Sequence, residues 1–242
     1  MADLALASRV TVAQRRILDL THARVRRAWT TLDDLSDEAG EAAVAEVVPA
    51  VVSAQNTVVA LHAGYVNVVT GLPLAAPVVA TLIDQAAWNR SALGQARRLV
   101  TEGTPFAEAL DLASRRAAQV HSGDVLRARD DVLTAMGDGL EPVRPLRWAS
   151  IPGPTACEWC RLISTKLYYR PDGLPRHLND RCGINAVMPG EADQYTNASS
   201  SFRSYRWRSR VQSSEIAEIQ RRTGETAQRL YGEAMDNMRK AA

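Results

Sequence analysis

The sequence predicts a mainly α chain of the α+β class, and three observations lead to this prediction. Apolar residues repeat every three to four positions through most of the first 139 residues, which is the period of amphipathic helices. The period shortens to two from Leu140, as in a β-strand. The only three cysteines of the 242-residue chain then fall within 26 residues. We expect a helical domain over 1–139, a β module over 140–192, a linker over 193–212 and an amphipathic helix over 213–242.

The first predicted helix covers about residues 4–32 and places its apolar side chains on one face. Ser36 is the predicted N-cap of the second helix, because its hydroxyl can accept a hydrogen bond from a backbone N–H of the first turn. Asp37 and Glu38 suit the positive end of the dipole of that helix. The apolar face of the first helix contains Val10, Ile17, Leu18, Val25 and Trp29.

The second predicted helix, about residues 37–69, carries alanine and valine on nearly every side and is therefore expected to be the buried central element. Pro49 predicts a kink or a break after Val48, because proline lacks the N–H that continues the helix. Gly71 and Pro73 are expected to end it.

Three further helices are expected in the first half of the chain. The third covers about residues 77–100, and Thr104 with Pro105 starts a fourth that reaches His121. The fifth covers 124–136 and is expected to stop at Gly137 and Gly139. His22, His62 and His121 have no second ligand at helical spacing, so we interpret them as core or surface residues.

The β module is expected to contain three short strands, over residues 143–149, 162–169 and 182–187. So few short strands bury little apolar surface, and a bound metal could contribute the missing folding free energy. The cysteine spacing offers such a site. Cys157 and Cys160 form a Cys-x2-Cys pair, and His177 and Cys182 follow from a later segment.

This spacing is typical of a closed structural zinc site of the Cys3His kind. We predict Zn²⁺ bound by Cys157, Cys160, His177 and Cys182, with Asp180 as the alternative fourth ligand. A redox-active Cys157–Cys160 pair or a disulfide are the other interpretations of the same residues. A catalytic zinc site would need an open coordination position and a general base, for which Glu158 is the nearby candidate.

No motif of a known catalytic class accompanies these cysteines. The sequence lacks G-x-S-x-G, a Walker-type glycine loop and H-E-x-x-H, and no Ser-His-Asp or Ser-Lys arrangement has a supporting local motif. We therefore expect no enzymatic activity. We also find no apolar run of 18 or more uncharged residues and no signal peptide, so we expect a protein of the cytosol without membrane contact.

The net charge of +2 conceals an asymmetry, because residues 1–143 carry 13 basic and 17 acidic side chains whereas residues 144–242 carry 16 and 10. Part of the basic excess lies in the linker, where aromatic and arginine side chains alternate. Such a segment could stack on bases and contact phosphates, or it could be a solvated linker, which we favour. The candidate nucleic-acid residues are Phe202, Arg203, Tyr205, Arg206, Trp207, Arg208 and Arg210.

The segment Ala156-Cys157-x2-Cys160-Arg161, preceded by a helical region and followed by His177 and Cys182, resembles the phage head morphogenesis family, the minor head proteins similar to phage Mu protein F. The resemblance covers roughly residues 75–190. Members of that family typically close the motif with Cys-x-Cys after a shorter gap, whereas this chain has Cys182-Gly-Ile184.

The resemblance implies a minor capsid component that associates with the portal protein and other capsid proteins during head assembly. It further implies a location inside the virion head near the portal, after a period in the host cytoplasm, with an oligomer on the portal and packaged DNA as further possibilities. The alternative from another class is a zinc-ribbon or treble-clef nucleic-acid-binding protein or nuclease. A nuclease would need further His or carboxylate ligands beyond the structural ones.

Overall fold

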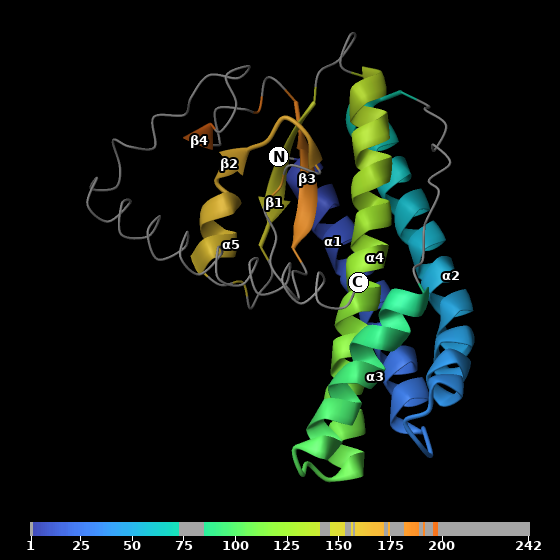
Figure 1. Ribbon diagram of the computed structural model, residues 1–242. Coiled ribbons are helices and arrows are strands. Elements are labelled where there is room, and N and C mark those ends of the chain that lie inside the picture. The colour runs from blue at the N-terminus through green and yellow to red at the C-terminus, as the bar shows by residue number, and fades with distance from the viewer. Residues whose placement is uncertain are drawn as a thin grey trace, which may run out of the picture. The chain divides into compact units, whose positions relative to one another are not determined.

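The computed structural model describes residues 2–72, 85–140, 146–152, 156, 158–171, 174, 182–188, 191 and 196–197. Four long helices come first: α1 (Ala2–Thr30), α2 (Asp37–Thr70), α3 (Gln85–Thr101) and α4 (Phe106–Leu140) (Figure 1). Short elements follow: β1 (Arg147–Ile151), α5 (Glu158–Ile163), β2 (Lys166–Leu167), β3 (Gly183–Val187) and β4 (Thr196–Asn197). The mainly helical class with a small sheet is confirmed.

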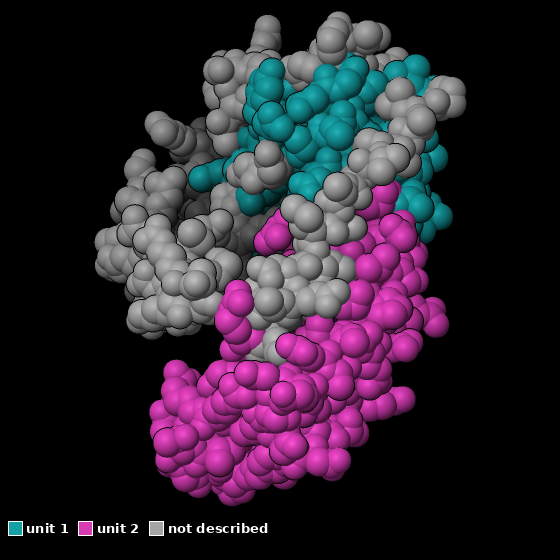
Figure 2. All heavy atoms as spheres, turned by 45° about the vertical axis from the view of Figure 1, so that its right-hand side comes forward, with its two compact units in different colours: residues 1–14, 60–78, 130–236 teal, residues 15–59, 79–129, 237–242 magenta. Residues whose placement is uncertain are grey.

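The chain forms two compact units, shown in different colours in Figure 2. Unit 1 contains residues 1–14, 60–78 and 130–236, and unit 2 contains residues 15–59, 79–129 and 237–242. Each of α1, α2 and α4 therefore contributes one part to each unit. All the described strands belong to unit 1.

Unit 2 is built around an apolar core that takes side chains from all four long helices. The predicted face of α1 is confirmed here, because Leu18, Val25 and Trp29 are fully buried. Arg97 of α3 also fixes the loop between α1 and α2: its guanidinium donates to the Leu35 carbonyl at 2.6 and 2.9 Å and to Asp37 Oδ1 at 2.7 Å. The core contains Leu18, Val25, Trp29, Val44, Val47, Val51, Val58, Leu93, Val125 and Leu126.

The start and the end of α2 agree with the sequence. The Ser36 hydroxyl accepts a hydrogen bond from the Ala39 N–H at 3.1 Å, as an N-cap does. Gly71 has a φ of 68°, the left-handed conformation that commonly ends helices. The helix continues through Pro49 without a break, because Val47 and Val51 on either side are buried in the core.

The prediction that α2 is buried on nearly every side is wrong. One third of its most apolar stretch is buried, and Val68 is 67% exposed. Residues 47–83 also carry no charged side chain, so the expectation of no long uncharged apolar run is wrong. Among the described helices, α2 is the one long and apolar enough to cross a membrane by length and composition alone. Those two criteria do not distinguish a membrane span from the core helix of a globular protein.

The predicted boundary between a fourth and a fifth helix is wrong as well, since α4 continues through Gly123, Gly137 and Gly139. A glycine in a helix costs only about 1 kcal/mol relative to alanine. Buried side chains before and after Gly123, such as Ala118 and Val125, maintain the helix. Gly137 has a packing role, because a Cβ there would lie 3.0 Å from Trp148 Cζ2.

The strands of unit 1 form two small sheets (Figure 1). β1 pairs antiparallel with β3, from Arg147↔Val187 to Ile151↔Gly183, and β2 pairs in parallel with β4. Trp148 and Tyr168 form an antiparallel bridge that joins the chain after β2 to β1. The third predicted strand is confirmed by β3, whereas Leu162 and Ile163 of the second lie in α5. β4 lies within the predicted linker, and the predicted helix over 213–242 lies outside the described residues.

Candidate metal centre

Two of the four predicted zinc ligands lie within the described residues, and both are buried. Cys160 belongs to α5 and is 1% exposed, and Cys182 directly precedes β3 and is 7% exposed. Cys157, His177 and the alternative ligand Asp180 lie outside the described residues. No group of three metal-ligating side chains occurs among the residues that were placed, so the zinc site remains a prediction.

The topology brings the elements that carry Cys160 and Cys182 to the same strand. The ladder of β1 and β3 ends at Ile151↔Gly183, so Cys182 enters it at the end where β1 leads toward residues 152–157. The chain then forms α5, which contacts β1. The segments that carry the two buried thiols therefore both lie next to β1.

One local expectation about this site is corrected. The second strand was expected to begin at residue 162, just after Cys160, but residues from Glu158 to Ile163 form the short helix α5. The Ser164 N–H donates to the Cys160 carbonyl at 3.1 Å, which continues the helical hydrogen bonding by one residue. The backbone of Cys160 is therefore fixed by helical hydrogen bonds.

A tyrosine from α2 anchors the strand that follows Cys182. The Tyr65 hydroxyl donates to Asn185 Oδ1 at 2.7 Å and accepts from the Ala186 N–H at 2.8 Å. Ala186 lies opposite Trp148, whose own backbone groups bond to Tyr168 on the other side of β1. The Ala186 N–H therefore points away from the ladder, and Tyr65 satisfies a donor that would otherwise be buried without a partner.

Gly183, between Cys182 and the rest of β3, lies against α1. An added Cβ would be 1.8 Å from Thr11 Oγ1, so no larger residue fits without displacing the strand or the helix. Thr11 is itself fixed by donating to the Ala7 carbonyl at 2.8 Å. This contact places the backbone beside Cys182, and a lone glycine inside a strand pattern was the sequence signal for it.

Two arginines connect β1 and the chain after β2 to other parts of unit 1. The Arg147 guanidinium lies 4.0 Å from the centre of the Tyr169 ring, within the range of a cation–π contact. Arg170 forms an ion pair with Asp138 of α4 at 3.2 Å. The sequence pattern indicated neither contact, because the partners belong to different elements.

The three histidines outside the cysteine region are accounted for by hydrogen bonds or by burial. His62 is fully buried and hydrogen-bonds Gln14 Oε1 at 3.0 Å within unit 1. In unit 2, His22 hydrogen-bonds the Ser122 hydroxyl. Burial, and to a smaller extent the charge of His22, lowers the pKa of His121 from 6.5 to about 3. His121 is therefore neutral at physiological pH.

The candidate nucleic-acid residues from Phe202 to Arg210 lie outside the described residues, so their role remains a prediction.

A family model described as VG15 protein matches residues 1–208, which include every described helix and strand. No curated protein and no solved structure matched the chain. The family indicates a phage-encoded protein, in agreement with the phage origin expected from the cysteine motif, and it does not specify a role in the head. The chain therefore belongs to the VG15 protein family.

Proposed function

We propose that this protein is a minor structural component of a phage head that associates with the portal during assembly. The observation that carries the proposal is the family match over residues 1–208, which indicates phage origin for the helical region and the cysteine-containing module together. The motif Ala156-Cys157-x2-Cys160-Arg161 adds the resemblance to minor head proteins. The protein would act by docking rather than by turnover, inside the virion near the portal.

Within this function, a zinc ion would have a structural role. Cys160 and Cys182 are buried on elements that flank β1, and Cys157 and His177 have the sequence spacing of the remaining ligands. Bound zinc supplies folding free energy, about 10 kcal/mol or more in zinc-finger peptides. Four protein ligands leave no open coordination position, which suits a structural site rather than a hydrolase.

Copurification tests the docking proposal. The full chain, coexpressed with the portal protein of the same phage, should copurify with it at moderate salt, because an apolar contact is less screened than a purely ionic one. The chain without residues 213–242 should copurify less, since that segment has an apolar seam at helical spacing. Absence of any complex between the full chain and the portal protein contradicts the proposed association.

Metal analysis tests the zinc proposal independently of the portal. Protein purified without chelator should contain about one zinc per chain, and Cys160→Ser or Cys182→Ser should abolish most of it. His177→Ala should reduce the zinc content less than either cysteine change, because Asp180 or water could replace the imidazole. Protein without zinc at any stage of purification disproves the site.

A further inference from the structure

Two exposed stripes in unit 2 have the same spacing and opposite charge. On α1, Arg16, Leu20 and Arg24 follow one another at intervals of four residues. On α2, Glu38, Ala42 and Glu46 do the same. All six side chains are exposed, and residues four apart on a helix form a continuous ridge.

The four charged side chains of these stripes have no ion-pair partner within the described part of the molecule. Arg16, Arg24, Glu38 and Glu46 form no ion pair with any residue that the structure describes. Arg26, on another side of α1, does form an ion pair.

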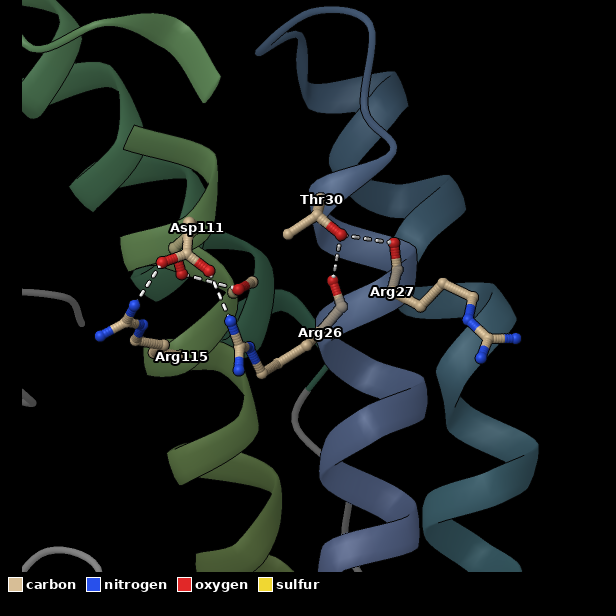
Figure 3. Close-up of polar contacts among 6 residues, drawn as sticks. Arg26, Arg27, Thr30, Asp111 and Arg115 are labelled. Carbon is tan, nitrogen blue, oxygen red and sulfur yellow. Dashed lines mark hydrogen bonds and ion pairs between the residues drawn. The ribbon is translucent and has the colours of Figure 1, made fainter. Parts of the chain in front are cut away.

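Arg26 donates to Asp111 Oδ1 at 2.5 Å, and Arg115 donates to Oδ2 of the same carboxylate at 2.6 Å (Figure 3). This ion pair of α1 thus involves a different face from the stripe.

An exposed apolar residue occupies the centre of the basic stripe. Leu20 is 67% exposed, one of the two most exposed large apolar side chains among the described residues. A single exposed leucine is ordinary on a protein surface. A leucine with an arginine one turn away on either side, however, has the composition of a small interface with an apolar centre and a charged rim.

We propose that the α1 stripe of one copy of this chain docks on the α2 stripe of a second copy. The two stripes have equal length, since 16–24 and 38–46 each span about 12 Å of helix. Rows of residues four apart are the ridges that interdigitate in the commonest class of helix packing. Leu20 would lie over the small Ala42, and the flanking arginines would face the flanking glutamates of the other copy.

This contact joins two different surfaces, so it is heterologous. In a dimer, one copy retains its acidic stripe and the other retains its basic stripe. Repetition of such a contact produces a ring when the rotation closes and an open chain when it does not. The stripes are smaller than the roughly 1,200–2,000 Å² of a stable interface. Association should therefore depend on protein concentration and weaken as salt screens the exposed charges.

Charge reversal tests the proposal in sedimentation velocity experiments on the full chain. The wild-type chain should form oligomers at high concentration and low salt, and the oligomers should dissociate at high salt. Arg16→Glu with Arg24→Glu should give a monomer, because two acidic stripes then face each other. Glu38→Arg with Glu46→Arg should give a monomer for the corresponding reason, and a mixture of the two variants should associate again.

The mixture distinguishes docking from misfolding, because a damaged fold would not be rescued by the second variant. Arg98→Glu is the control, since it reverses a charge at an exposed position on α3 whose ion-pair partner Glu102 is also exposed, and it should leave the oligomers intact. Self-association is disproved if the wild-type chain stays monomeric at low salt, if either reversed variant associates as wild type does, or if the mixture stays monomeric. This proposal does not depend on portal binding. If the wild-type chain stays monomeric and Arg16→Glu with Arg24→Glu abolishes copurification with the portal protein, the α1 stripe binds the portal instead.

Discussion

The core of unit 2 and the strands of unit 1 differ in the kind of contact that holds them. In unit 2, four helices contribute many interchangeable apolar side chains to one core. On the strands of unit 1, one small apolar cluster contains Ala149, Leu167 and Val187. All five residues of β3 are buried, and individual atoms add to its position, namely the Tyr65 hydroxyl and the absent side chain of Gly183.

This difference has a consequence for how each unit responds to mutation. An apolar core loses stability in proportion to the buried volume removed. A strand positioned by single polar contacts loses stability when one hydrogen-bonding atom is removed, even if the volume hardly changes.

The largest expected effect is in unit 2. Trp29→Ala removes a fully buried side chain from the core and should lower the free energy of unfolding by about 3–5 kcal/mol. Urea denaturation followed by circular dichroism measures this change. Val68→Ala, at a position 67% exposed, is the control and should change it by less than about 0.5 kcal/mol. Equal effects at the two positions would contradict the core assignment.

A smaller effect is expected from one oxygen atom in unit 1. Tyr65→Phe keeps the ring but leaves the Ala186 N–H without its acceptor, which should cost about 1–3 kcal/mol. Thr30→Val also removes a hydroxyl, but that group is exposed and donates only within its own helix, to the Arg26 and Arg27 carbonyls (Figure 3). It should be nearly neutral. A neutral Tyr65→Phe would mean that this contact does not stabilise β3.

The smallest expected effect is the contribution of His121, in unit 2, to the pH dependence of stability. Because the pKa of His121 is about 3 in the folded protein and near 6.5 when unfolded, the unfolded chain binds a proton first as the pH falls. Stability contributed by neutral His121 should therefore be complete above pH 6.5 and decline below it, by at most about 1.4 kcal/mol per pH unit. Melting temperatures measured from pH 7 to pH 4 should fall less steeply for His121→Leu. Parallel curves would show that His121 does not titrate in this way.

The sequence predicted the helical part better because helical periodicity is a local signal. The face of α1, the Ser36 cap and the end of α2 at Gly71 followed from neighbouring residues. The predicted stop in α4 was wrong for a physical reason, since Gly137 and Gly139 were given the weight of helix breakers although packing outweighs their small cost. α2 was expected to be more deeply buried than it is, because its small outer residues resemble core residues in composition.

The contacts around the candidate metal centre were less predictable. Tyr65 and Asn185 are 120 residues apart, and no periodic pattern connects them. The cysteine spacing predicted the site, and the ladder end at Ile151↔Gly183 places Cys182 beside the end of β1. The sequence could not indicate that the intervening residues include a helix, because six residues are too few to show a period.

Amide hydrogen exchange on the full chain, before and after removal of zinc by a chelator, tests most directly whether zinc stabilises the strands of unit 1 and not the core of unit 2. If zinc and single polar contacts hold the strands of unit 1, chelation should accelerate exchange in residues 147–151 and 183–187. Exchange in residues 44–58 of α2, which belong to the apolar core of unit 2, should remain slow. Unchanged exchange in the two strands after chelation, or equal acceleration in both units, would contradict the account.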